Sequence, residues 1–489
     1  MNSPKPVPVA FALAAVAALA GHASAQVIGP DCISSSHNDV ARNGVGAGGS
    51  ITAYSIGSVT CNKGDMTMEA GPNSTIRPLV GQAMYRLKSY TAPGGGTYQR
   101  FESVGQGWCK WVGVPVNGSH TSCGTCVGGG GTGFMGINCA DTYSSGFNGA
   151  SGMARRTFIN PTTGYLTGTR GGGTAETSIN TRLQVPTADV TAQPAGTRFF
   201  VETVHLLPHD ATWVRPGQVV AINAMNNASS QEVNINAGTA NPTLLNGFNQ
   251  QIPAIERWKL IDPSVTVVTA DHDDTPNPNA AFPNTFIRSR FHIAAKVTDL
   301  GGGQWRYEYA IYNLNSDRAA GSFTIPLPAG ASFTDYTFRH PLYHSGEAIS
   351  NSPWTADRQN NKLTFATEKH VVNNSANAIR WGTMYNFGFT SNVAPASGLG
   401  IIELFKPGTL ENISTPAIPV PSLPTCIADL NLDNNLTADD IIAYLNAFFG
   451  TNLTVADIAS LGGATGPDGR LTADDLVVYL SAFFAGCPQ

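Results

Sequence analysis

The stretches RFHIAAKV (290–297) and QWRYEYAIY (304–312) alternate apolar and polar residues, and they decide the fold. Every second residue is apolar, from Phe291 in the first stretch and from Trp305 in the second, and most residues between them are polar or charged. Successive side chains of a β-strand point to opposite faces of a sheet. This period of two therefore predicts antiparallel strands that are buried on one face.

The same alternation extends to the neighbouring segments. WGTMYNFGF (381–389) places its aromatic residues on one side, and NLNSDRAAG (313–321) has the composition of a hairpin loop. We therefore predict an antiparallel β-sandwich for residues 196–412. Residues 26–195 are rich in Gly, Ser and Cys, with strand-like pieces such as SITAYSIGSVTC (50–61) between glycine loops. The expected fold class is mainly β, with a Gly/Cys-rich β region before the sandwich.

The composition agrees with a β-rich chain and excludes one class of partner. Only 12% of the 489 residues are charged, whereas Gly and Pro number 53 and 31. Such a balance favours short strands and turns over long helices. The formal net charge of −5 offers no attraction to nucleic acid or to an anionic membrane surface. We expect no nucleic-acid partner.

The N-terminal residues 1–25 have the pattern of a signal peptide. Lys5 precedes an apolar run, and Ala23-Ser24-Ala25 suits signal peptidase. The run is too short to cross a bilayer, and no later run reaches the roughly 20 apolar residues of a membrane helix. We therefore expect a secreted, extracellular bacterial protein without a membrane span.

Cysteine usage predicts structural disulfides. An even number of cysteines in an exported chain is typical of a disulfide framework, and the chain has eight: Cys32, Cys61, Cys109, Cys123, Cys126, Cys139, Cys426 and Cys487. CGTC (123–126) could instead form a redox pair, but thioredoxin-like chemistry requires a helix after the first cysteine, and VGGGGTG follows.

A proline-rich stretch, ISTPAIPVPSLPT (413–425), follows the predicted sandwich. Four prolines in this stretch favour polyproline II and disfavour pairing in a sheet. We predict a semi-rigid linker here, with a separate module at 426–489.

The module contains a repeat, ADLNLDNNLTADDIIAYLNAFFG (428–450) and ATGPDGRLTADDLVVYLSAFFAG (464–486). In the first copy, oxygen-bearing residues stand at loop positions 1, 3, 5, 7, 9 and 12. These positions suit calcium, which takes six to eight oxygen ligands. The predicted ligands are Asp429, Asn431, Asp433, Asn435 through its carbonyl, Thr437 and Asp440. Thr437 is also placed to cap the apolar helix that follows.

These loop–helix units resemble a type I dockerin. No helix precedes the first loop, Asp440 stands where an EF-hand usually has Glu, and the unit is duplicated behind a proline-rich stretch. The resemblance covers residues 426–489 only. It implies calcium as the bound ion and docking onto a cohesin-like protein or a cell-surface component. It also implies an association with extracellular polysaccharide.

The second copy matches less completely. Its matching residues at positions 5, 7, 9 and 12 are Asp468, Arg470 through its carbonyl, Thr472 and Asp475. Ala464 and Gly466 fill positions 1 and 3, so we expect weaker calcium binding here. Cys426 and Cys487 flank the two units, and a bridge between them would stabilise the module by roughly 4 kcal/mol.

Asp-rich turns that only cap the two helices are the alternative to calcium loops. The charge of the module argues against that alternative, because residues 426–489 contain eight Asp and one Arg. Without a cation such a module repels itself.

Catalytic patterns are scarce in residues 26–411. GVGAGG (44–49) matches a dinucleotide-binding pattern but runs into a predicted strand, and G-x-S-x-G does not occur. His205 and His209, like His340 and His344, have the spacing of a zinc-binding helical pair. The nearby Pro208 and Pro341 argue against helices, and we expect histidines that are solvated or packed in the core.

Two further segments each have a functional and a structural interpretation. ADHDDTPNPN (270–279) could bind a metal or supply an acid and a base, although a surface turn is the simpler prediction. Trp354 lies in a polar stretch and could form a sugar-stacking platform, although such tryptophans usually pack in the core.

Two classes of function remain open. The first is a polysaccharide-associated protein, either a binding protein or a glycan-degrading hydrolase or lyase whose catalytic site is not located. The second is a non-catalytic matrix or cell-surface scaffold. Paired carboxylates in a pocket would favour an enzyme.

Overall fold

The computed structural model describes residues 28–71, 74–111, 117–129, 131–147, 152–169, 171, 179–328, 330–421, 427–430, 436–460, 462–465 and 468–486. The predicted signal peptide lies outside the described residues, as do Cys426, Cys487 and three predicted calcium ligands, Asn431, Asp433 and Asn435. The fold is mainly β, as the sequence predicts, with several antiparallel sheets and short helices.

The first sheet contains eleven strands among the described residues. Its main path, in spatial order, is β1 (Cys32–Val45), β2 (Ile51–Asn62), β10 (Leu183–Pro186), β5 (Thr97–Gln106), β4 (Leu79–Thr91), β11 (Arg198–Leu206), β13 (Ala228–Ile235) and β14 (Pro242–Leu244). Three short strands pair beside this path: β6 (Cys109–Trp111), β8 (Ala140–Tyr143) and β9 (Met153–Ala154).

The first sheet curls back on itself. Ser34 in β1 places its Oγ 2.7 Å from Thr203 Oγ1 in β11, and Ser229 Oγ in β13 donates a hydrogen bond to the Ser34 carbonyl at 2.7 Å. Strands far apart along the sheet therefore meet around an apolar interior, which includes Tyr54, Met84, Leu183, Phe199 and Val233.

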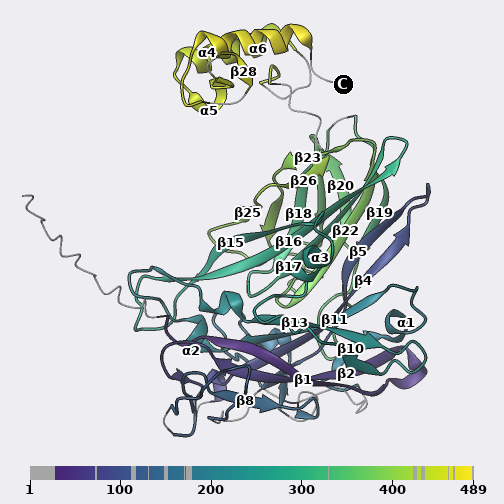
Figure 1. Ribbon diagram of the computed structural model, residues 1–489, viewed down its shortest axis with the longest axis vertical. Helices are drawn as coiled ribbons and strands as arrows, with labels where there is room; N and C mark the ends of the chain where they lie inside the picture. Colours follow the sequence, from purple (N-terminus) through teal and green to yellow (C-terminus); the bar gives the residue numbers. More distant parts are fainter. Residues whose placement is uncertain are drawn as a thin grey trace, which may run out of the picture.

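The second and third sheets form the predicted sandwich (Figure 1). The second sheet is ordered β15 (Thr266–Pro276), β16 (Phe286–Gly301), β17 (Gln304–Asn313), β22 (Thr383–Ser391) and β19 (Thr334–Arg339), with β12 (Val220–Ala221) parallel to β16. The third is ordered β20 (Thr355–Gln359), β21 (Lys362–Ala366), β18 (Ala320–Pro326), β24 (Ile401–Leu404) and β25 (Asn412–Ser414). Apolar side chains of both sheets share one core, among them Phe291, Tyr309, Phe323, Phe365, Phe387 and Ile402.

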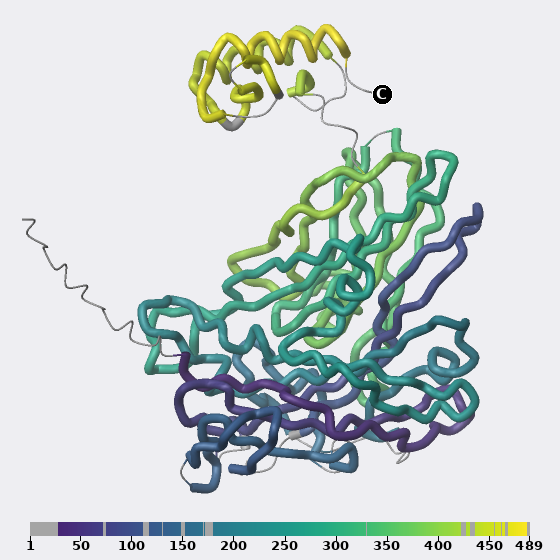
Figure 2. The backbone as a smooth tube through the Cα atoms, in the orientation of Figure 1, coloured from purple at the N-terminus to yellow at the C-terminus, as the bar shows by residue number. Residues whose placement is uncertain are grey.

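The other face of the second sheet packs on the first sheet. Tyr85, Phe101 and Phe200 of the first sheet share a core with Ala310 and Tyr312 of β17. Trp258, from α3 (Glu256–Ile261), closes this core. In Figure 2 the hairpin of β4 and β5 rises beside the green strands of the sandwich. The Asn386 side-chain amide in β22 donates to the Phe101 carbonyl in β5 at 2.8 Å, which fixes that contact.

β17 is therefore buried on both faces, and the prediction of half-buried strands is wrong for it. Arg306 and Glu308, which alternation places opposite the apolar residues, are each 1% exposed. Arg100 of β5 donates two hydrogen bonds to the Glu308 carboxylate, at 2.7 and 3.0 Å. A polar face that meets complementary charge in another layer has the same sequence pattern as a face that meets water.

The first sheet also crosses the domain boundary predicted between residues 195 and 196. β11 pairs with β4 along its whole length, from Arg198 opposite Leu87 to Leu206 opposite Leu79. The two predicted regions thus share one continuous sheet.

The linker prediction for 413–425 is wrong up to residue 421. β26 (Ile418–Pro421) pairs with β23 (Pro395–Gly398), and Ile418 and Val420 are fully buried in the sandwich core. Prolines alternate with these two residues in a strand that has one partner, so the missing N–H groups fall on the unpaired side. Residues 422–426 lie outside the described residues.

Two disulfides lie in the first region, Cys61–Cys123 and Cys126–Cys139. The two cysteines of CGTC each bond to a different partner, so they are structural and do not form a redox pair. Cys32 and Cys109 are buried free thiols, which contradicts the expectation that all cysteines pair. Burial raises the pKa of both thiols, to about 12 for Cys109.

The C-terminal module is helical, as predicted. It contains α4 (Ala438–Phe449), α5 (Leu453–Ala456) and α6 (Ala473–Ala485), with a short hairpin of β27 (Ala459–Ser460) and β28 (Ala464–Thr465). The remaining elements are β3 (Met68–Glu69), which pairs with β7 (Phe134–Met135), the helices α1 (Thr187–Val190) and α2 (Pro208–Ala211), and the 3₁₀ turns η1 (Ala47–Gly49), η2 (Ser74–Ile76), η4 (Arg156–Phe158) and η5 (Asn223–Asn226).

Candidate functional site

Asp440 joins the first predicted calcium loop to its helix. Its Oδ2 accepts a hydrogen bond from the Thr437 N–H at 2.9 Å, and Thr437 caps α4 in return. Its Oδ1 accepts from the Leu430 N–H at 3.0 Å, beside Asp429. Burial, together with the charges of Asp440 and Asp429, raises the pKa of Tyr479 to about 12. The carboxylates at positions 1 and 12 therefore lie near the same phenol.

Asp475 has the same role in the second loop. Its Oδ2 accepts from the Thr472 N–H at 2.8 Å, and Thr472 caps α6. Its Oδ1 accepts from the N–H groups of Ile458 and Ala459, at 2.9 and 2.8 Å. Burial alone would raise the pKa of Asp475, but these hydrogen bonds lower it below its ordinary value. The carboxylate is therefore held in its charged form.

The two units exchange contacts in a near-symmetric way. The Tyr444 hydroxyl of α4 donates to the Ala456 carbonyl, and the Tyr479 hydroxyl of α6 donates to the Ala428 carbonyl, both at 3.1 Å. The two tyrosine rings stack with centroids 3.8 Å apart and planes 5° apart. Each helix thus supports the segment that precedes the other loop.

This exchange reveals a candidate ligand that the spacing argument missed. Asp457 follows Ala456 as Asp429 follows Ala428, and the sequence itself repeats the pattern as ADL (428–430) and ADI (456–458). The Asp457 carboxylate accepts the N–H groups of Asp468 and Gly469, at 3.0 and 2.7 Å. Asp457 therefore occupies the place that the sequence spacing assigned to Ala464.

An insertion explains why the spacing misled. Ala464 belongs to β28, and the β27–β28 hairpin lies between Asp457 and Asp468. The second loop therefore reaches the same arrangement with a longer chain. Arg470 is exposed, and Gly466 lies outside the described residues.

The donor set of the module fits a hard cation. Four aspartates that are each 7% exposed or less occur in this small module, Asp429, Asp440, Asp457 and Asp475. Buried carboxylates are costly unless they are paired, and oxygen-only donors suit calcium. Within the described residues, no group of three His, Cys, Asp or Glu side chains could hold a metal ion, but Asn431 and Asp433 lie outside them.

The first predicted histidine pair is structural. His205 is fully buried with its Nε2 2.7 Å from Thr60 Oγ1, and burial lowers its pKa to about 3. His209 accepts a hydrogen bond at Nδ1 from the Glu69 N–H. His205 belongs to β11 and His209 to α2, which Pro208 begins, so no single helix carries both histidines.

The second histidine pair, His340 and His344, and Trp354 also have structural roles. His340 donates through Nδ1 to the Pro341 carbonyl, and His344 packs against Trp108 with ring centroids 5.2 Å apart. Trp354 is 2% exposed, and its indole N–H donates to the Asn377 carbonyl. Trp354 is therefore a core residue and does not form a sugar platform.

ADHDDTPNPN does not begin as a surface turn, because its first seven residues belong to β15. Asp271 pairs with Arg290 at 2.7 Å, and Asp273 pairs with Arg288 at 2.9 Å, on the more exposed side of the strand. Asp274 is buried. Because successive side chains of a strand point to opposite faces, the carboxylates of this segment do not converge on one site.

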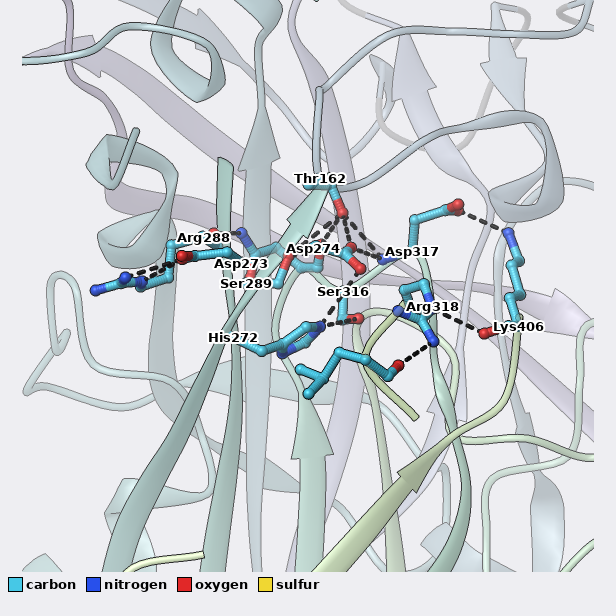
Figure 3. A network of polar contacts seen from close by, with 12 residues as sticks. Thr162, His272, Asp273, Asp274, Arg288, Ser289, Ser316, Asp317, Arg318 and Lys406 are labelled. Atoms are coloured by element: carbon cyan, nitrogen blue, oxygen red, sulfur yellow. Dashed lines mark hydrogen bonds and ion pairs between the residues drawn. The ribbon is translucent and has the colours of Figure 1, made fainter. Parts of the chain in front are cut away.

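Asp274 anchors a buried polar network (Figure 3). Its Oδ2 accepts from Thr162 Oγ1 and from the Asp317 N–H, the latter at 3.0 Å. His272 Nε2 lies 3.4 Å from Asp274 Oδ1 and 3.1 Å from Ser316 Oγ. Burial alone would raise the pKa of Asp274, but hydrogen bonds and the charge of His272 lower it.

The Ser–His–Asp composition of this network does not make it a catalytic triad. A triad requires serine and aspartate on opposite ring nitrogens. Here Ser316 and Asp274 both approach Nε2 of His272, and Ser316 is 1% exposed. The network instead holds the loop of Ser316 and Asp317 in place.

That loop forms one wall of a cavity of about 300 Å³. Segments from several elements of the β-rich part of the chain before residue 422, here called the body, converge on it. The lining residues are Gln106, Arg155, Arg156, Thr157, Phe158, Ile159, Ser316, Asp317, Ala319, Tyr343, Glu347, Ala348, Ile349, Asn374, Ser375, Arg380, Trp381 and Lys406. The lining combines aromatic rings, neutral polar groups and charges of both signs. No sequence pattern pointed to this cavity, because its residues are scattered over 300 positions of the chain.

The cavity carboxylates are already engaged. Glu347 accepts from the Arg156 N–H at 2.7 Å and from Thr157 Oγ1 at 2.6 Å. Asp317 pairs with Lys406 at 2.8 Å. Both carboxylates therefore position the wall of the cavity.

Comparison with protein-family models finds none that matches the chain, and comparison with curated proteins finds no relative. Among the described residues, no helix has the length and apolar character needed to cross a membrane.

Proposed function

We propose that this chain is an extracellular, dockerin-like protein whose C-terminal module binds calcium and docks onto a cohesin-like partner. The observation that carries the proposal is an exposed apolar surface repeated on both helices. Ile442 and Phe449 on α4 are 55% and 77% exposed, and Val477 and Phe484 on α6 are 60% and 80% exposed. Each pair is seven residues apart, so its members lie on one face of their helix.

The repetition supports docking because the exposed residues are not needed for the module core. That core is formed by Tyr444, Tyr479, Ala428 and Ala456 with their partly buried neighbours. Large apolar side chains that stay in water on matching faces are typical of a binding surface. A partner with an apolar face would cover both pairs.

Calcium would stabilise the docking surface. Asp429 and Asp440 in the first loop, and Asp457 and Asp475 in the second, would supply charged oxygens close to the start of each helix. The ion would neutralise buried carboxylates that otherwise repel one another. Because each loop is joined to the other helix through a tyrosine, both sites would affect the same surface.

Calorimetric titration of the chelated full-length chain tests calcium binding. We expect two sites, with Asp429→Asn removing the first and Asp457→Asn removing the second. Asp439→Asn, next to Asp440 on the exposed side of α4, serves as the charge-matched control and should bind normally. Calcium binding that is the same in all four proteins would contradict the ligand assignment, and docking should weaken in Phe449→Ser and Phe484→Ser without loss of calcium.

We further propose that the body associates with polysaccharide as a binding protein. The engaged state of Asp317 and Glu347 supports binding over hydrolysis, since neither carboxylate has the freedom expected of a general acid or nucleophile. Incubation with soluble polysaccharides, with release of reducing ends measured on the same samples, tests this choice. Retention without release is expected, and release that is abolished by Glu347→Gln would identify an enzyme.

A further inference from the structure

The cavity between the body segments has an excess of positive charge. Its lining contains Arg155, Arg156, Arg380 and Lys406, but its carboxylates are Asp317 and Glu347 alone among the described residues. Arg156 is held by carbonyls, donating to Gly107 and Gln82 at 2.8 Å each, and carbonyls do not cancel its charge. The cavity therefore favours an anion.

His344, which lies beside the cavity, is neutral because of its burial and its positively charged surroundings. Burial lowers the pKa of His344 to about 3, and the charges of Arg156 and Arg155 contribute. His344 thus adds no positive charge, and the cations of the cavity come from arginine and lysine.

Arg380 is held in place by two carbonyls and an aromatic ring, and its Nε donor is unpaired within the part of the chain that the structure describes. Its Nη2 donates to the carbonyls of Asn374 and Ala376, at 2.9 and 3.3 Å, and its guanidinium lies over the Phe405 ring at 5.4 Å. Its Nε is buried and has no hydrogen-bond partner among the described residues. A buried charged donor without a partner is costly, so an acceptor at this place would be favourable.

Gln106 gives a second, independent sign of a missing ligand. This residue is 1% exposed, and neither its amide oxygen nor its amide nitrogen has a hydrogen-bond partner within the described chain. An amide of this kind needs both a donor and an acceptor. A hydroxyl group supplies both.

The size and the aromatic lining restrict the ligand further. A cavity of about 300 Å³ is at the lower limit of small-molecule sites, which suits a single ring. Tyr343, Phe158 and Trp381 supply aromatic surface, and Asn374 and Ser375 add neutral polar groups. Polar groups interspersed with aromatic rings match a polyhydroxylated ring.

We propose that this cavity binds one uronic acid residue of an acidic polysaccharide, with the sugar carboxylate toward Arg380 and sugar hydroxyls toward Gln106. The proposal rests on the proposed association with polysaccharide and names its substrate class. The buried Asp274 network contributes by holding the wall that carries Ser316 and Asp317 (Figure 3).

The test is calorimetric titration of the full-length protein with galacturonic and glucuronic acid and their short oligomers. Galactose, glucose and sodium sulfate are the comparison ligands. Arg380→Gln and Gln106→Glu should each weaken uronate binding at least tenfold, on the order expected for one charge-assisted hydrogen bond. Lys369→Gln is the charge-matched control, because this lysine side chain is 76% exposed and lies outside the cavity.

The outcomes separate this inference from the proposed function. Uronate binding that both cavity variants weaken and Lys369→Gln retains supports the inference. Equal binding of neutral sugars overturns the acidic class but leaves the polysaccharide association, whereas binding of no sugar overturns both and leaves the calcium titration unaffected. Sulfate binding as tight as uronate binding reduces the cavity to a general anion site. Melting temperatures show whether Arg380→Gln is folded, and Gln106→Glu decides the question if it is not.

Discussion

Arg100 and Glu308 form a two-point ion pair between layers, although they lie 208 residues apart in the chain. Arg100 belongs to β5 of the first sheet and Glu308 to β17 of the second, and their exposed fractions are 5% and 1%. Arg306 also donates to the same carboxylate, at 2.8 Å. The layers are therefore joined by buried charge as well as by apolar packing.

We predict that Glu308→Gln lowers the free energy of unfolding by about 3–5 kcal/mol, because it removes the anion that two buried guanidinium groups share. Asp271→Asn is the matched control, since its pair with Arg290 has side chains 29% and 27% exposed. An exposed pair contributes about 0–1 kcal/mol. Denaturant unfolding of the three proteins measures the difference, and similar losses in both variants would contradict it.

Truncation tests where the body ends. A chain that stops after Pro421 should keep the melting transition of the body, whereas one that stops after Glu411 loses β25 and β26. Burial of Ile418 and Val420 then disappears, at a cost of roughly 3–6 kcal/mol. Differential scanning calorimetry compares the two chains. Equal melting temperatures would restore the linker prediction for the whole of 413–425.

Asp141 gives a pH-dependent prediction. Burial raises its pKa to about 6, although a hydrogen bond from the Tyr143 hydroxyl at 2.8 Å opposes the rise. Between pH 4 and pH 6 the folded state then binds more protons than the unfolded state, so stability falls as pH rises through this range and is level above it. The total loss is about 3 kcal/mol.

Asp141→Asn should therefore leave stability nearly unchanged at pH 4 and increase it at pH 7. Melting temperatures at both values measure this, with the exposed Asp357→Asn as a control that should show no such difference. An equal shift for Asp141→Asn at both pH values would mean that the carboxyl group does not titrate in this range.

The assigned disulfides and free thiols can be tested by chemical labelling. Alkylation of the unfolded, unreduced protein, followed by peptide mapping, should label Cys32 and Cys109 and leave Cys61, Cys123, Cys126 and Cys139 unlabelled. The folded protein should resist labelling at both free thiols, because they are buried. The same map reports whether Cys426 and Cys487 are bridged, as the sequence predicts. Labelling of Cys123 and Cys126 together would contradict the assigned pairs.

The alternation of apolar and polar residues was enough to predict the sandwich. Phe291 and Tyr309 each belong to a stretch in which every second residue is apolar, and only a strand explains that period. It could not predict that Arg306 and Glu308 face another layer, since their partner Arg100 is supplied by a distant strand. Periodicity also failed at Pro419 and Pro421, where alternate prolines fit a strand with one partner.

The predicted calcium ligands also show that contacts between distant residues cannot be read from sequence spacing. Fixed spacing located Asp440 and Asp475, which cap helices and therefore keep a constant offset from them. It missed Asp457, because an inserted hairpin changed the spacing while the contact between the units preserved the position. The cavity around Gln106 and Arg380 had no local pattern at all, since tertiary packing alone brings its lining together.

The stacked rings of Tyr444 and Tyr479 give the molecule two separable optical signals. All seven tryptophans of the chain lie between Trp108 and Trp381, so the C-terminal module absorbs near-ultraviolet light through its tyrosines and not through indole. Two phenol rings 3.8 Å apart couple their electronic transitions, which produces a circular dichroism band that disappears when the helices separate. Fluorescence excited at the red edge of tryptophan absorption reports only on the body, which contains all the tryptophans. One spectrometer cuvette can therefore follow assembly of the module and integrity of the body at the same time.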